Sequence, residues 1–230
     1  MASRRTTRAV LLDALGTLLA LEPPAPLLRR ELARRFRIEI SEEQAGRALG
    51  TEIAYYRAHL DEGRDASGLA ALRRRCAGVL QEALPATDEV AALNPDELTE
   101  TLLASLRFTA FPDVHPALTA ARSHGRRLVV VSNWDISLVD VLERLGLSPL
   151  LDGILTSAQV GARKPSPRIF SRALELAGVD ASECVHVGDS LEEDIAGARA
   201  AGIAAILIRR DGVPGPSGIP TIKTLDELDT

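Results

Sequence analysis

The residues best suited to chemistry in this sequence stand directly after, or close to, short apolar runs. Asp13 follows Ala9-Val10-Leu11-Leu12, and Asp189 follows a second run that ends in Gly188. Carboxylate oxygens are hard ligands of the kind that Mg²⁺ prefers, with water and substrate phosphate completing its shell. The pair Ser132-Asn133 follows a third run, and its hydroxyl and amide can hydrogen-bond phosphate oxygens. This set of residues suits a small phosphorylated ligand and a divalent cation.

Each of these features also has an ordinary structural interpretation. An Asp after a strand often caps a turn, and acidic residues such as Glu192 and Glu193 stabilise a helix start. We expect Asp135 to be such a cap, for a helix beginning near Ile136. Lys164 is less ordinary, because only two of the 27 basic residues are lysines. Its compact ammonium fits a crowded phosphate–carboxylate site better than a guanidinium does.

The elements that must position these residues follow from the hydrophobic pattern. Five continuous apolar runs predict strands buried on both faces, which is typical of a parallel sheet. Helix-length amphipathic stretches lie between them, each followed by a glycine, and Pro165 is expected to open one of these helices. The alternation predicts an α/β fold with a doubly wound parallel sheet. The runs and stretches are 9–12, 128–131, 153–155, 185–187 and 204–208, and 112–124, 136–145, 167–177 and 191–201.

Residues 20–107 interrupt this alternation. They contain no strand-like run and carry Ala, Leu, Arg and Glu at helical spacing, with Pro23-Pro24 at the entry. We therefore predict an α/β core domain formed by residues 1–19 and 108–230, and an inserted all-helical cap domain formed by residues 20–107. Such an insertion would lie over the carboxyl ends of the strands, where open α/β sheets bind ligands.

Composition limits the partners and the compartment. The net charge of −5 and the pI near 5.5 argue against nucleic acid, and no apolar run approaches the length of a membrane span. Two cysteines are too few for a disulfide framework. The Arg-rich start, residues 1–8, lacks a cleavage site and is not expected to be a secretory signal. We predict a cytoplasmic protein with a small-molecule substrate. The sequence indicates no oligomeric state.

Taken in order, the four motifs resemble those of the haloacid dehalogenase-like hydrolases, in the subfamily with a helical cap after the first motif. The resemblance covers essentially the whole chain. It implies that Asp13 is the nucleophile and that Mg²⁺ is bound by Asp13, Asp189 and the backbone carbonyl of Leu15. It also implies that Ser132 and Lys164 hold the phosphoryl oxygens, that Lys164 steadies the charge of Asp13, and that Asp194 supports the site from behind.

One departure from the family pattern bears on function. Most phosphatases of this family carry a second Asp two residues after the nucleophile, as general acid and base, and here that position is Leu15. Such a group contributes on the order of 10²- to 10⁴-fold. A substrate whose leaving group needs no proton, or an acid from the cap such as His59, Asp61 or Glu62, would compensate.

Three functions remain open. The first is a Mg²⁺-dependent phosphatase that works through an aspartyl-phosphate at Asp13. The second is a 2-haloacid dehalogenase-type hydrolase with an ester intermediate at Asp13, which ranks lower because the metal-binding Asp189 is kept. The third is a catalytically weak binding or regulatory protein, which ranks lowest because nucleophile, lysine and metal-binding Asp are all present.

Overall fold

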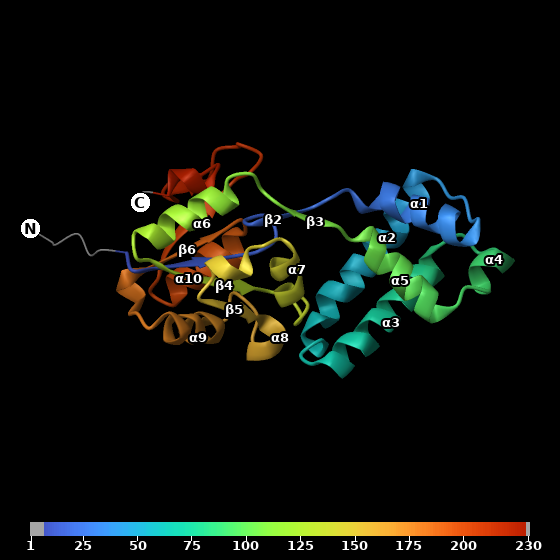
Figure 1. The fold of residues 1–230 in the computed structure, drawn as a ribbon, viewed down its shortest axis with the longest axis horizontal. Helices are drawn as coiled ribbons and strands as arrows, with labels where there is room; N and C mark the ends of the chain where they lie inside the picture. Colours follow the sequence, from blue (N-terminus) through green and yellow to red (C-terminus); the bar gives the residue numbers. More distant parts are fainter. Residues whose placement is uncertain (1–6, 229–230) are drawn as a thin grey trace, which may run out of the picture. The chain divides into compact units, whose positions relative to one another are not determined.

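The computed structural model describes residues 7–228, so the expectation about the N-terminal start falls mostly outside the described chain. Within this range the chain divides into two compact units. One unit ends at Ala20 and resumes at Ala110, and the other spans Leu21–Thr109. The two units are coloured along the sequence in Figure 1.

The first unit contains a six-stranded sheet in the order β5-β4-β1-β6-β7-β8, and every neighbouring pair is parallel. The expected doubly wound parallel sheet is confirmed. The central strands are buried on both faces, which explains their unbroken apolar sequence. The strands are β1 (Ala9–Leu12), β4 (Arg127–Ser132), β5 (Gly153–Thr156), β6 (Cys184–Gly188), β7 (Ala204–Ile208) and β8 (Thr221–Ile222).

Helices α6 and α9 lie on opposite faces of this sheet (Figure 1). Phe170 and Ile169 of α9 are fully buried in a core shared with β1, β4 and β7. The glycines expected to end four helices do so with positive φ, as at Gly178, where φ is 66°. The helices of this unit are α6 (Val114–Ser123), α7 (Leu138–Arg144), α8 (Ser157–Val160), α9 (Pro167–Ala177) and α10 (Gly197–Ala200), with 3₁₀ turns η2 (Ser148–Leu150), η3 (Ala181–Glu183) and η5 (Leu225–Glu227).

Three local expectations differ from the structure. The stretch 191–201 begins as a π-helix, η4 (Leu191–Ala196), and becomes α-helical only in α10. The proline at the first position of α9 is Pro167 and not Pro165, because Ser166 caps this helix. Two short strands, β2 (Leu19–Leu21) and β3 (Phe108–Ala110), pair with each other where the chain leaves and re-enters the first unit. Three-residue strands are too short to produce a periodic signal in the sequence.

The second unit is helical. Its longer helices are α1 (Pro24–Phe36), α2 (Glu42–His59), α3 (Ala66–Ala83) and α5 (Pro95–Ser105). The turn η1 (Leu60–Glu62) and the short helix α4 (Asp88–Ala91) lie between them. A leucine-rich core joins these helices. None of the helices in residues 7–228 is both long enough and apolar enough to cross a membrane.

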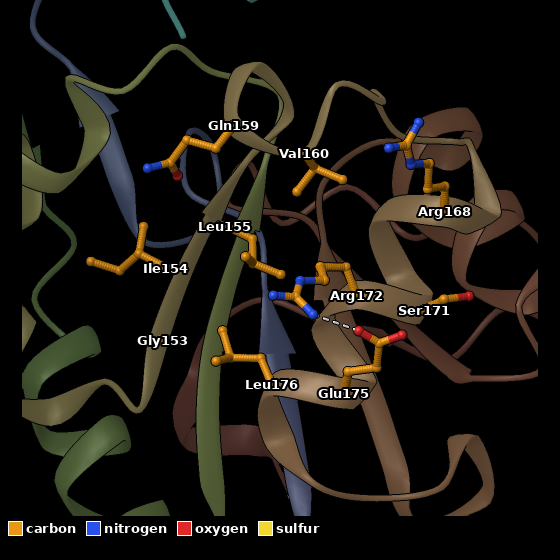
Figure 2. A pocket seen from close by; sticks show the side chains of 10 residues that line it. All are labelled: Gly153, Ile154, Leu155, Gln159, Val160, Arg168, Ser171, Arg172, Glu175 and Leu176. Atoms are coloured by element: carbon orange, nitrogen blue, oxygen red, sulfur yellow. Dashed lines mark hydrogen bonds and ion pairs between the residues drawn. The ribbon is translucent and has the colours of Figure 1, made fainter. Parts of the chain in front are cut away.

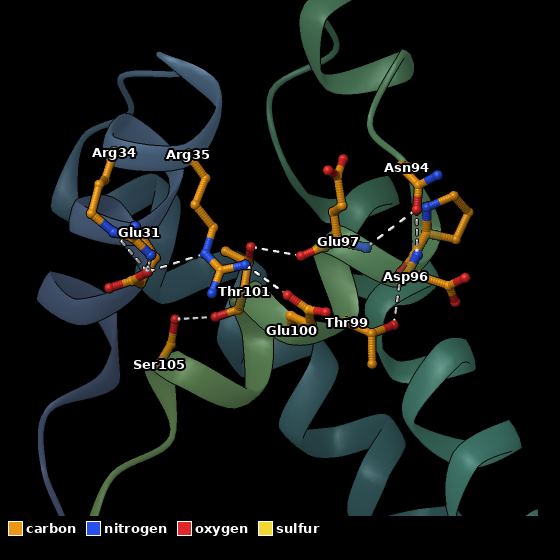
Figure 3. Close-up of polar contacts among 11 residues, drawn as sticks. Glu31, Arg34, Arg35, Asn94, Asp96, Glu97, Thr99, Glu100, Thr101 and Ser105 are labelled. Carbon is orange, nitrogen blue, oxygen red and sulfur yellow. Dashed lines mark hydrogen bonds and ion pairs between the residues drawn. The ribbon is translucent and has the colours of Figure 1, made fainter.

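Polar side chains fix the helix ends of this unit. Asn94 accepts hydrogen bonds from the first backbone N–H groups of α5, and Ser41 forms a capping box with Gln44 at α2. Figure 3 shows the Asn94 cap together with Arg35, which bridges Glu31 of α1 and Glu100 of α5.

Candidate active site

Asp13 lies at the carboxyl end of β1, between the ends of β4 and β6. Its backbone N–H donates to the carbonyl of Val187, 2.9 Å away, and this bond continues the β1–β6 ladder by one residue. Leu12 pairs with Val130 and with Val187 in the two flanking strands. The parallel register therefore brings the motifs that follow β4 and β6 to the same edge of the sheet as Asp13.

One oxygen of the Asp13 carboxylate is held by two donors. Ser132 Oγ donates to Oδ1 at 3.1 Å, and Lys164 Nζ donates to the same atom at 2.6 Å. Asp13 is 6% exposed and Lys164 is 3% exposed. The contacts found within residues 7–228 place no side-chain donor on Asp13 Oδ2, so one oxygen is fixed and the other is left for a reacting group or a cation.

Lys164 also contacts a second buried carboxylate. Its Nζ lies 2.5 Å from Asp194 Oδ1, and the Nε2 atom of His186 lies 2.8 Å from the same oxygen. The backbone N–H of Ser190 donates to Asp194 Oδ2 at 3.0 Å. Both oxygens of Asp194 are thus occupied, and this side chain holds Lys164 toward Asp13.

The side chain of Asn133 holds the backbone of Lys164. Its Oδ1 accepts the backbone N–H of Lys164 at 2.8 Å, and its Nδ2 donates to the Lys164 carbonyl at 3.0 Å. The Asn133 side chain also opposes the rise that burial causes in the pKa of Glu193. We expected Asn133 to bind phosphate oxygens, but its carboxamide is used to position Lys164.

Three carboxylates meet at this edge in a way that fits a divalent cation. Oxygens of Asp13, Asp189 and Asp194 all lie within 4.8 Å of one another. Because Asp194 is already fully hydrogen-bonded, Asp13 and Asp189 have the oxygens left for a metal. Gly16 lies against Asp189, and a Cβ on Gly16 would come 2.1 Å from Asp189 Oδ2. This oxygen-only donor set suits Mg²⁺. Leu15, whose carbonyl was expected to join it, is half-buried and forms an isolated bridge with Leu19.

The electrostatics of the site are dominated by negative charge. Burial raises the pKa of Asp13 and the charge of Asp194 raises it further, while Lys164 opposes both. The pKa of Asp189 is raised to about 7, by desolvation and by the charges of Asp13 and Asp194. Burial opposes ionisation of Asp194, but Lys164 and His186 outweigh it and lower the pKa of Asp194. Burial disfavours the charged form of Lys164, yet the two carboxylates raise the pKa of its ammonium. One buried ammonium facing three carboxylates leaves an excess of negative charge that a divalent cation would offset.

The sequence matches the model of a known protein family over most of its length. Residues 7–202 match the model of the haloacid dehalogenase-like hydrolases. The chain belongs to this family. Among curated relatives, the haloacid dehalogenase-like hydrolase domain-containing protein 3 of Mus musculus is 35% identical over 153 residues, covering 62% of this chain and 61% of that protein. A glyceraldehyde 3-phosphate phosphatase of Methanopyrus kandleri is 39% identical over 101 residues, covering 44% and 43%. The matches thus span about half the length of these relatives.

Solved haloacid dehalogenase-like structures resemble the chain over nearly its full length. A phosphatase of this family from Thermococcus onnurineus is 29% identical with a TM-score of 0.67, covering 96% of this chain and 95% of that one. A 2-haloacid dehalogenase from Pseudomonas syringae pv. Tomato is 28% identical with a TM-score of 0.68, covering 97% and 96%. Both a phosphatase and a dehalogenase are therefore among the similar structures.

Two residues of this haloacid dehalogenase-like site were not expected from the sequence. His186 is fully buried on β6, bonds Asp194 and meets the ring of Phe170 edge-on. Arg210 donates to the carbonyl of Thr17 at 2.6 Å and to both oxygens of Asp113, so it anchors the loop that carries the nucleophile. The sequence signal available for His186 was a histidine in an otherwise apolar strand just before Gly-Asp. Nothing local in the sequence indicates the role of Arg210.

The remaining expectations concern residues around this family site. Asp135 is not the helix cap that we expected, because α7 begins at Leu138 and Ser137 occupies its N-cap position. The carboxylate of Asp135 accepts a hydrogen bond from the N–H of Ser137 at 2.7 Å, in the turn that leads into the helix. Trp134 is buried. In the helical unit, His59 Nδ1 bonds the carbonyl of Tyr55, and Glu62 forms an ion pair with Arg75.

A hollow in the surface lies elsewhere on the same unit. It has a volume of about 680 Å³ and is framed by β5, α8 and α9 (Figure 2). None of the site residues named above lines it. Its lining residues are Gly153, Ile154, Leu155, Gln159, Val160, Arg168, Ser171, Arg172, Glu175 and Leu176.

Proposed function

We propose that the protein is a Mg²⁺-dependent phosphatase that acts on a small phosphorylated metabolite through an aspartyl-phosphate at Asp13. The observation that carries this proposal is the pair of bonds from Ser132 and Lys164 to Asp13 Oδ1, together with the nearby carboxylate of Asp189. The phosphatase names of relatives that match part of the chain support the same activity.

In this proposal Asp13 attacks phosphorus through Oδ2. A carboxylate nucleophile splits hydrolysis into two displacements, each easier than direct attack by water. Lys164 and Ser132 keep the carboxylate oriented and face the charge of the transferring phosphoryl group, which is the main task in phosphoryl transfer. Asp13, Asp189 and the Leu15 carbonyl would hold Mg²⁺. The cation would neutralise phosphoryl oxygens.

Positioning residues stand behind these groups. Asp194 holds the ammonium of Lys164 in place, and Asn133 fixes the backbone that carries it. We further propose that residues 20–107 act as a cap domain that sets substrate specificity, and that the substrate is a small phosphorylated molecule.

Release of phosphate from p-nitrophenyl phosphate tests the proposal. We expect turnover that requires Mg²⁺, is abolished by EDTA, and disappears in Asp13→Asn. Asp140→Asn, on the exposed face of α7, is the matched control and should keep full activity. Turnover by Asp13→Asn comparable to the parent protein would overturn the assignment of the nucleophile.

Haloacid dehalogenation is the second candidate, because a 2-haloacid dehalogenase is among the structures similar over the full chain. It would use the same Asp13 to displace halide from carbon, and it would not need the cation. Halide release from 2-chloropropionate in the presence of EDTA, without phosphate release from any ester, would favour this function over the first.

A further inference from the structure

The polar side chains around Asp13 in the α/β unit hydrogen-bond to one another. Ser132 Oγ and Lys164 Nζ both donate to Asp13, and Lys164 also donates to Asp194. Asp194 accepts hydrogen bonds from Lys164 on one oxygen and from the Ser190 N–H on the other, and these donors favour its ionised form, which has no proton to give. His186, which could carry one, is completely buried behind Asp194. None of these four groups is placed to protonate a departing oxygen.

Two further positions near the nucleophile bear on whether the α/β unit supplies a proton donor. Leu15, two residues beyond Asp13, has an aliphatic side chain where the resemblance places a proton donor. Glu193 is exposed, and Asn133 favours the charged form of its carboxylate. In the described part of the α/β unit, Glu193 is thus a carboxyl near the site that is neither hydrogen-bonded to Lys164 nor proposed to bind metal.

From this arrangement we propose that the natural substrate is an acyl phosphate, the mixed anhydride of a carboxylic acid and phosphoric acid. This rests on the proposed phosphatase function and narrows its substrate class. A carboxylate is a weak base, with a conjugate acid of pKa about 4, and leaves at neutral pH without a proton. An alkyl phosphate must instead expel a strongly basic alkoxide, which normally requires a positioned acid that contributes on the order of 10²- to 10⁴-fold.

The two steps are chemically alike for such a substrate. In the first, a new bond forms between Asp13 Oδ2 and phosphorus, and the bond from phosphorus to the acyl oxygen breaks, releasing the carboxylate. In the second, water forms a bond to phosphorus and the Asp13 carboxylate departs, releasing inorganic phosphate. The sum is acyl phosphate plus water giving carboxylate, phosphate and one proton, which the water supplies to solvent or to phosphate. Each step expels a carboxylate, so neither leaving group needs an acid.

The dependence of rate on the leaving group tests this inference. Initial rates of phosphate release are measured with Mg²⁺ for acetyl phosphate, a series of substituted phenyl phosphates and ethyl phosphate, with Asp13→Asn as the blank for spontaneous hydrolysis. We expect kcat/KM to fall steeply as the basicity of the leaving group rises, with ethyl phosphate at least about 100-fold below acetyl phosphate. A flat dependence would show that another group, in either unit, delivers the proton, and would overturn the inference.

A matched pair of variants tests whether the aliphatic side chain of Leu15 causes the expected preference for weakly basic leaving groups. Leu15→Asp introduces a carboxyl, and Leu15→Asn has the same shape without an acid. We expect the ratio of kcat/KM for ethyl over acetyl phosphate to be at least about 10-fold higher in Leu15→Asp than in Leu15→Asn. An equal ratio in two folded variants would contradict this explanation. Glu193→Gln should leave the parent ratio unchanged, and a selective loss of ethyl phosphate turnover in it would identify Glu193 as the acid and overturn the proposal.

The test of the substrate class can fail while the test of the proposed phosphatase function succeeds. If p-nitrophenyl phosphate is hydrolysed in an Asp13-dependent way but the leaving-group dependence is flat, the phosphatase stands and only the substrate class fails. If no phosphate is released from any compound, the phosphatase itself fails.

Discussion

Lys164 Nζ lies 2.6 Å from Asp13 Oδ1, and both side chains are buried. The two residues are 151 positions apart in the sequence. The same ammonium lies 2.5 Å from Asp194, so a single cation stands between two buried carboxylates. A buried charge left without its partner is strongly destabilising, so Lys164 contributes to stability as well as to the proposed catalytic site.

Replacement of Lys164 should damage both properties. In Lys164→Met the two carboxylates lose their shared cation, and we expect the free energy of unfolding to fall by about 3 kcal/mol. We expect kcat to fall at least about 100-fold, because the nucleophile loses its orientation and the phosphoryl group its counter-charge. Urea unfolding and steady-state kinetics measure the two effects. Lys223→Met, at an exposed lysine, should change neither, and an unaffected kcat in Lys164→Met would remove Lys164 from the mechanism.

Gly16 should be required for metal binding. A Cβ there would come 2.1 Å from Asp189 Oδ2, so Gly16→Ala must displace the proposed metal ligand. We expect the Mg²⁺ concentration for half-maximal activity to rise at least about 10-fold. The control is Gly125→Ala, which shares a positive φ but meets nothing within 4 Å. Both variants should lose about 1 kcal/mol of stability from backbone strain, and only the first should change the Mg²⁺ requirement. The same requirement in both variants would argue against Asp189 as a ligand.

His186 should position Lys164 through Asp194. Without the bond from Nε2, Asp194 Oδ1 would keep Lys164 as its one side-chain donor and draw the ammonium away from Asp13. We expect kcat in His186→Leu to fall roughly 10-fold with KM nearly unchanged, and partial recovery in His186→Gln, which can still donate. A merely structural role would lower thermal stability equally in the two variants without this difference in kcat. His124→Leu, at an exposed histidine, is the control.

Glu52 should make the stability of the helical unit depend on pH. It is 3% exposed, and burial raises its pKa to about 7 from 4.5. A raised pKa in the folded state means that the protonated form is favoured there. Its contribution is therefore fully present below pH 4.5 and is lost as the pH rises through about 7.

We expect Glu52→Gln to abolish this loss and to stabilise the protein by about 3 kcal/mol relative to the parent at pH 8. Urea unfolding monitored between pH 5 and pH 8 measures the effect. Glu82→Gln, on an exposed position of α3, should follow the parent protein. A parent stability that is flat over this range would contradict the prediction.

The sequence by itself determined the fold class and the positions of the chemical groups along the chain. Short continuous apolar runs between amphipathic helical stretches predict strands buried on both faces, and parallel strands place their carboxyl ends at one edge. Asp13, Ser132 and Asp189 are therefore expected at that edge from local pattern alone. The helices of residues 20–107 were likewise readable from their spacing, but β2 and β3 were too short to produce a periodic signal.

Only the tertiary structure decided what each group contacts. In η4 the N–H of Ile195 bonds the carbonyl of Ser190, five residues back, and this irregular turn accompanies the inward placement of Asp194 while Glu193 stays exposed. The use of Asn133 on the Lys164 backbone is equally invisible in the sequence. Such choices depend on strand register and on side-chain direction across segments distant in the chain. Local periodicity indicates which face of a helix or strand a residue occupies, but it does not indicate which distant residue the side chain contacts there.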